Sequence, residues 1–199
     1  MSEPDIQPAA PRAGVLRTAI LVEAGIGLLG WAIGIGLGRS PMDFFHWRMV
    51  DLIWGVAATV PMLAALAVCL WLPFAPMRRL TRIVREILIP MFQGAHWTQI
   101  ALISALAGWG EELFFRGVVQ YFSQQWLGPL GGLAVASIVF GLAHPLTRTY
   151  IVVAAVIGAY LGWLWLTFDN LLVPMVAHGL YDFVVLMWML RTTPVDAQE

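Results

Sequence analysis

The sequence predicts an all-α protein, a polytopic transmembrane helical bundle of about six spans with one amphipathic helix lying in the membrane interface. Hydrophobic residues make up 60% of the 199 residues, and charged residues make up only 12%. The mean hydropathy of +0.79 lies far outside the range of soluble domains. The apolar residues also occur in runs of about 20, the length that a helix needs to cross a bilayer.

Six apolar runs are long enough to cross a bilayer as helices. In chain order they are 18–38, 52–74, 97–122, 129–144, 150–168 and 170–190. The fourth run is the shortest, so its helix should either tilt or extend past Pro145. The first run carries glycines four residues apart, Gly30, Gly34 and Gly38. This spacing predicts close packing against a neighbouring helix of the chain, with a homodimer contact as the alternative.

The segment between the second and third runs predicts a helix that lies on the membrane. In MRRLTRIVREILIP the arginines share one helical face and the apolar residues share the other. The polar face holds Arg78, Arg79, Arg82 and Arg85, and the apolar face holds Leu80, Ile83, Val84, Ile87 and Leu88. Pro90 is expected to stop this helix, because proline lacks the N–H that a helix interior requires.

These elements divide the chain into four regions. Residues 1–17 are polar and rich in proline and are expected to form a disordered tail. Residues 18–96 hold two spans and the interfacial helix, and residues 97–190 hold a core of four spans. Residues 191–199 form a C-terminal tail.

The basic residues predict the orientation of the chain in the membrane. All eleven are arginines. If the amphipathic helix is cytoplasmic, the cytoplasmic side holds Arg12, Arg17, Arg78, Arg79, Arg82, Arg85, Arg148 and Arg191, and the outside holds only Arg39 and Arg48. This imbalance predicts that both termini are cytoplasmic. The arginine-only, Ala- and Gly-rich composition points to a bacterial inner membrane. The net charge of -1 and the lack of a long basic run exclude nucleic acid as a partner.

Two adjacent carboxylates, Glu111 and Glu112, lie with Arg116 inside an apolar run, in AGWGEELFFRGVVQ. Ionisable groups at membrane depth are costly and usually functional. Glu112 and Arg116 are four residues apart, so on a helix they share a face and can form an ion pair. Glu111 points elsewhere and stays free, which predicts a general base.

Two later runs also carry ionisable groups at helical spacing. His144 ends FGLAH, one turn after Phe140, and His178 and Asp182 share a face in HGLYD. One internal site shared by three spans explains all these groups together. With the predicted orientation, Glu111 lies past the middle of its span and His144 lies near the inner end of its own. The two can meet only if the spans are irregular or the interfacial segment dips deeper.

The ordered motifs EExxxR, FxxxH and HxxxD, over roughly Trp97 to Leu190, resemble those of the CPBP family of intramembrane proteases. This family contains the type II CAAX prenyl endopeptidases and the lysostaphin-resistance or bacteriocin-immunity proteins. The resemblance implies an endopeptidase that acts on a membrane-associated peptide or protein in the lipid bilayer.

Carried over residue by residue, the resemblance implies that Glu111 and His144 activate a water. It also implies that His178 and Asp182 stabilise the oxyanion and that Glu112 and Arg116 support the site. Asp182 departs from the eukaryotic pattern, which has an amide there. An ionised aspartate would repel an oxyanion, so Asp182 must be protonated, orient His178 or bind a metal.

Several alternatives remain open at this stage. Glu111, His144 and His178 could ligate a catalytic zinc. Metal-independent catalysis is favoured, because there is no HExxH and these residues come from three separate spans. A non-catalytic immunity or scaffold protein and a proton-coupled carrier are the alternatives from other classes. Glu23 could face the polar interior, reach toward Arg17 or belong to the site.

Overall fold

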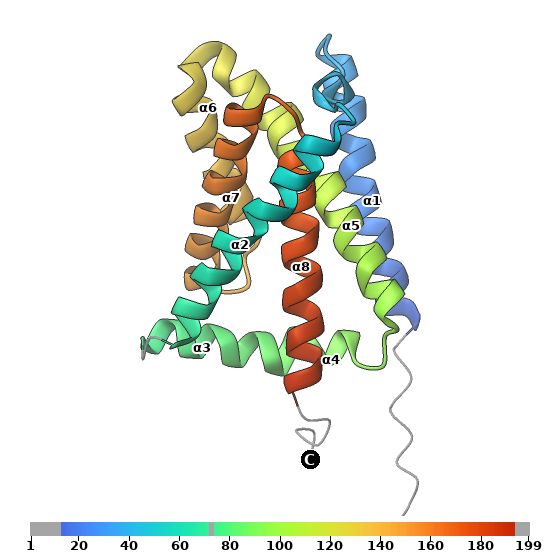
Figure 1. The fold of residues 1–199 in the computed structure, drawn as a ribbon, viewed down its shortest axis with the longest axis vertical. Coiled ribbons are helices and arrows are strands. Elements are labelled where there is room, and N and C mark those ends of the chain that lie inside the picture. The colour runs from blue at the N-terminus through green and yellow to red at the C-terminus, as the bar shows by residue number, and fades with distance from the viewer. Residues whose placement is uncertain (1–12, 72–73, 194–199) are drawn as a thin grey trace, which may run out of the picture.

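The computed structural model describes residues 13–71 and 74–193 (Figure 1). Within these residues every regular element is helical, which confirms the all-α prediction. The elements are α1 (Ala13–Gly36), η1 (Pro41–Phe44), α2 (Met49–Trp71), α3 (Ala75–Ile83), η2 (Val84–Leu88), α4 (Ile89–Phe92), α5 (Trp97–Phe114), η3 (Phe115–Gln120), α6 (Tyr121–Leu142), α7 (Arg148–Phe168) and α8 (Leu172–Thr192). The short element η1 is a 3₁₀ helix, and η2 and η3 are π-helical turns.

Five continuous helical stretches of the described chain are long and apolar enough to cross a membrane. The longest of them, Trp97–Leu142, contains 46 residues and reverses direction within α6 at Gly128, where φ is 72° and ψ is 173°. Glycine adopts this positive φ at no steric cost, and the following Pro129 cannot donate a helical hydrogen bond. The reversal turns one stretch into two arms and confirms a bundle of about six spans (Figure 1).

The boundaries of several spans differ from the prediction. The helix α1 begins at Ala13, so residues 13–17 are helical and are not part of a tail, whereas residues 1–12 lie outside the described residues. The third span continues to the reversal at Gly128, and the fourth ends at Leu142 without extending past Pro145. The helix α8 runs to Thr192, and the remainder of the predicted C-terminal tail from residue 194 lies outside the described part.

Two glycines of α1, Gly27 and Gly30, pack against a neighbouring helix of this chain, whereas a Cβ atom added to Gly38, the last of the three predicted glycines, would meet nothing within 4 Å. A Cβ atom added to Gly27 would collide with the Trp109 ring and the backbone of Gly110, and one added to Gly30 would lie 2.9 Å from the Cα atom of Phe114. The helix α1 therefore lies directly against α5, as expected for small residues at a helix contact in a membrane. This contact places α1 beside the buried carboxylates of α5.

The amphipathic segment lies across one end of the bundle, underneath the spans (Figure 1). Leu80, Val84 and Ile89 are buried and pack with Met189 near the end of α8. The arginines at positions 78, 79 and 82 are exposed on the other face. The predicted amphipathic helix is confirmed, and it lies across the ends of the spans, the position that we expect of a helix in the membrane interface.

Pro90 does not stop the amphipathic helix, which continues to Phe92. A proline at this position cannot donate to the carbonyl four residues earlier. The π-turn η2 immediately before it widens the helix, and the N–H of Ile89 bonds the carbonyl of Val84, five residues back. The extra residue in the turn shifts the helical register, so Ile87 is 55% exposed and Ile89 is buried instead.

Candidate active site

The two predicted carboxylates lie on the last turn of α5, deep in the bundle. Glu111 is 7% exposed and Glu112 is fully buried. Glycines bring the neighbouring helices close to this turn. A Cβ atom on Gly108 would lie 2.5 Å from the carbonyl oxygen of Met175 and 2.8 Å from the nitrogen of Gly179, so α8 touches the α5 backbone there. This close contact places His178 beside Glu112.

Arg116 of η3 is completely buried and contacts residues of α5, α6 and α7. Its Nη1 donates to Oε1 of Glu112 at 2.8 Å, which confirms the predicted pairing of these two residues. Its Nη2 donates to the carbonyl oxygen of Gly158 in α7 at 2.7 Å. The guanidinium carbon also lies 4.8 Å from the centre of the Phe140 ring, a cation–π distance. The bond to Gly158 and the contact with the ring were not predicted.

His178 shares Glu112 with Arg116. Its Nδ1 lies 2.9 Å from the same Oε1 atom of Glu112, and its Nε2 lies 3.5 Å from Oδ2 of Asp182, one turn further along α8. Glu112 therefore holds both a guanidinium and an imidazole in place. Asp182 is more accessible, with 32% of its side chain exposed.

His144 and Glu111 face each other from different helices. Nε2 of His144 lies 3.7 Å from Oε2 of Glu111. Nδ1 of His144 lies 2.7 Å from the carbonyl oxygen of Phe140. A carbonyl can only accept a hydrogen bond, so Nδ1 carries a proton and Nε2 is the ring atom directed at the carboxylate. The Phe140 ring stacks on the imidazole with centroids 4.6 Å apart, which holds the ring in this orientation.

The reversal at Gly128 explains how these two side chains reach the same depth. Gly128 lies 17 residues after Glu111 and 16 residues before His144. Since each helical residue advances the chain by about 1.5 Å, two arms of nearly equal length return His144 to the level of Glu111. The spans are therefore irregular, which is one of the two solutions that the sequence left open.

Glu23 of α1 adds a further acidic group beside the polar cluster formed by Glu111, Glu112, Arg116, His144, His178 and Asp182. Its carbonyl oxygen touches Gly110, and its Oε2 is buried with no hydrogen-bond partner among the described residues. Gly110 directly precedes Glu111, so α1 brings Glu23 next to the turn of α5 that carries the two carboxylates. An isolated glutamate in an apolar span was the signal in the sequence, but spacing alone could not join it to Glu111, which lies 88 positions further along the chain.

The three candidate zinc ligands do not assemble into a metal site. Within residues 13–71 and 74–193, no group of three His, Cys, Asp or Glu side chains is arranged to hold an ion. Glu111 and His144 face each other, but the ring nitrogens of His178 face Glu112 and Asp182. The arrangement provides two potential ligands on one side and a separate hydrogen-bonded cluster on the other.

The comparisons with known proteins identify one match. A family model described as type II CAAX prenyl endopeptidase Rce1-like matches residues 83–184. The matched region contains all six residues predicted for the site, and Glu23 lies outside it. No curated protein and no solved structure matches the chain.

Proposed function

Because the chain belongs to the Rce1-like family of type II CAAX prenyl endopeptidases, we propose that it is an intramembrane endopeptidase that cleaves a membrane-associated peptide or protein. The observation that carries the proposal is the buried pair of Glu111 and His144. The family match accounts for a membrane protease, and the geometry of this pair supports a specific way of activating water.

In the proposed mechanism, Glu111 and His144 hold one water between them. With Nδ1 protonated, Nε2 of a neutral His144 is an acceptor, as is a carboxylate oxygen of Glu111. Two acceptors 3.7 Å apart can each accept a hydrogen bond from the same water. As the water oxygen attacks the peptide carbonyl carbon, Glu111 takes one proton and later delivers it to the leaving amine nitrogen.

His178 and Asp182 are proposed to stabilise the oxyanion that this attack creates. Nδ1 of His178 is engaged by Glu112, so a doubly protonated ring has Nε2–H as its remaining donor. That atom is 3.5 Å from Asp182, longer than a well-formed N–H···O bond of about 2.9 Å. This N–H can therefore donate a hydrogen bond to the oxyanion, and a preorganised donor in a dry site stabilises such a charge by a few kcal/mol. Glu112 and Arg116 position His178.

The substrate is tested by comparing the membrane peptidomes of cells that carry the wild-type chain or a Glu111→Ala version. We expect product peptides only with the wild type and uncut precursor only with the variant. Equal amounts of both proteins in the membrane are the control. Identical peptidomes would contradict the proposed protease activity and favour a non-catalytic immunity or scaffold protein.

Asp182→Asn separates the two proposed mechanisms. In the metal-independent mechanism the amide supplies a hydrogen-bond donor, so turnover should be kept or raised. In a zinc mechanism the change weakens support for the ion and should cost about 10- to 100-fold in metal affinity or activity. Elemental analysis and EDTA treatment of the wild type provide the second measurement. A nearly inactive variant together with one zinc per chain, whose removal stops turnover, would favour the metalloprotease.

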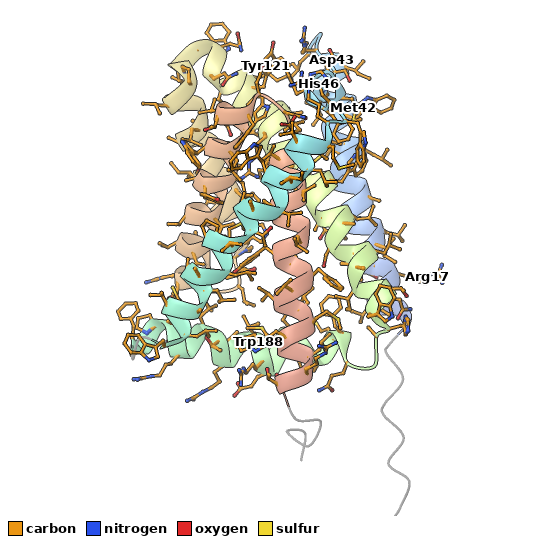
Figure 2. All side chains as sticks on the ribbon, in the orientation of Figure 1. Arg17, Met42, Asp43, His46, Tyr121 and Trp188 are labelled. Atoms are coloured by element: carbon orange, nitrogen blue, oxygen red, sulfur yellow. The ribbon has the colours of Figure 1, made fainter. Side chains whose placement is uncertain are left out.

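We also propose a bacterial inner membrane with both termini cytoplasmic. The start of α1, the end of α8 and the segment α3–α4 lie at the same end of the bundle (Figure 1). Figure 2 shows Arg17 at this end and Asp43 and His46 at the opposite end. With Cys69 replaced, cysteines introduced near Arg79 should react with a membrane-impermeant reagent only after cells are opened. Labelling in intact cells would show that the chain has the opposite orientation.

A further inference from the structure

A groove of about 740 Å³ separates α3 from the loop that joins α6 to α7. This volume lies within the usual range of small-molecule sites. The walls include Arg79, Leu80, Ile83, Leu146, Arg148 and Thr149. The groove is distinct from the polar cluster of the proposed active site, since none of the cluster's residues lines it.

The charge of the groove suits an anion. Arg79 and Arg148 are exposed, and neither forms a salt bridge within the described part of the chain. No carboxylate lines the groove, and Glu86, the acidic residue of the amphipathic segment, is not among its walls. Guanidinium groups bind phosphate oxygens through paired, charge-assisted hydrogen bonds. Arg148 and Thr149 also belong to the first turn of α7, whose N–H groups lack acceptors within the helix.

The position of the groove indicates whether that anion is a free phosphate or the headgroup of a lipid. The amphipathic segment lies across the end of the spans (Figure 1). In a membrane, an amphipathic helix in this position lies where the lipid headgroups meet the hydrocarbon region. Leu80, Ile83 and Leu146 provide an apolar surface next to the arginines. A free phosphate would leave this surface uncovered, whereas a phospholipid can cover it with an acyl chain. We propose that the groove binds one anionic phospholipid, with its phosphate between Arg79 and Arg148.

The test measures lipid binding by the full-length protein in detergent, using native mass spectrometry with added phosphatidylglycerol or phosphatidylcholine. We expect one phosphatidylglycerol to bind at least about tenfold more tightly than phosphatidylcholine. Arg79→Gln and Arg148→Gln should each weaken the binding of phosphatidylglycerol by about fivefold.

Arg78→Gln and Arg82→Gln are the matched controls, because these arginines lie on the same helix and are exposed but do not line the groove. They should change the affinity by less than about twofold. Melting temperatures establish that each variant is folded. If a glutamine variant is not folded, the lysine variant at the same position, Arg79→Lys or Arg148→Lys, which keeps the charge, is measured in its place. Equal losses from all four glutamine variants would indicate general surface charge and overturn the site. Displacement of the lipid by equimolar glycerol 3-phosphate would also overturn it, in favour of a small-anion site.

Discussion

Glu111→Gln is expected to lower kcat/KM for peptide hydrolysis by about 10²- to 10⁴-fold, the contribution typical of a general base. Glutamine has nearly the same shape as glutamate, but its amide cannot take a proton from water. His144→Ala should cause a loss of similar size, because it removes the group that faces Glu111 at 3.7 Å. The measurement is the cleavage rate of the purified variants on the substrate identified from the peptidome.

The double variant Glu111→Gln/His144→Ala makes this prediction sharper. Residues that act as one unit have grossly non-additive effects, so the double variant should be hardly slower than either single variant. Unchanged melting temperatures are the control for folding. Near-wild-type turnover in either single variant would remove that residue from the mechanism. Strictly multiplicative losses would show that the two residues do not act on one water.

Glu112→Gln is expected to reduce the free energy of unfolding by about 3 to 5 kcal/mol, because it leaves the buried charge of Arg116 without its partner. The bond between Arg116 and Gly158 cannot supply the missing negative charge. Activity should fall as well, since the same carboxylate oxygen of Glu112 binds His178. Denaturant unfolding in detergent micelles measures the change in stability.

Two comparisons isolate the effect of the ion pair. Glu112→Gln/Arg116→Met should be less destabilised than the sum of the two single variants, because neither charge is then left unpaired. Asp43→Asn breaks the Arg39–Asp43 pair, which has the same four-residue spacing but is about half exposed, and should cost less than about 1 kcal/mol. A loss for Glu112→Gln as small as that for Asp43→Asn would show that the buried pair contributes little to stability.

The class of the protein and the residues of its candidate site could be predicted from the sequence. Lipid cannot satisfy backbone hydrogen bonds, so long apolar runs must become helices. Carboxylates and histidines are costly at membrane depth, so Glu111, His144 and His178 stood out against their surroundings. Contacts within one helix follow from its period of 3.6 residues, which is why the pairing of Glu112 with Arg116 was predicted correctly.

Contacts between helices were decided only by the tertiary structure. The reversal at Gly128 returns His144 to the depth of Glu111, and the close approach of Gly108 to Gly179 places His178 on Glu112. Likewise, the π-turn before Pro90 allowed a helix to continue where proline alone predicted its end. The position of Glu23 beside the cluster depends on how α1 packs against α5. Sequence spacing specifies geometry along a single helix, but the depth and rotation of one helix against another depend on how their surfaces fit.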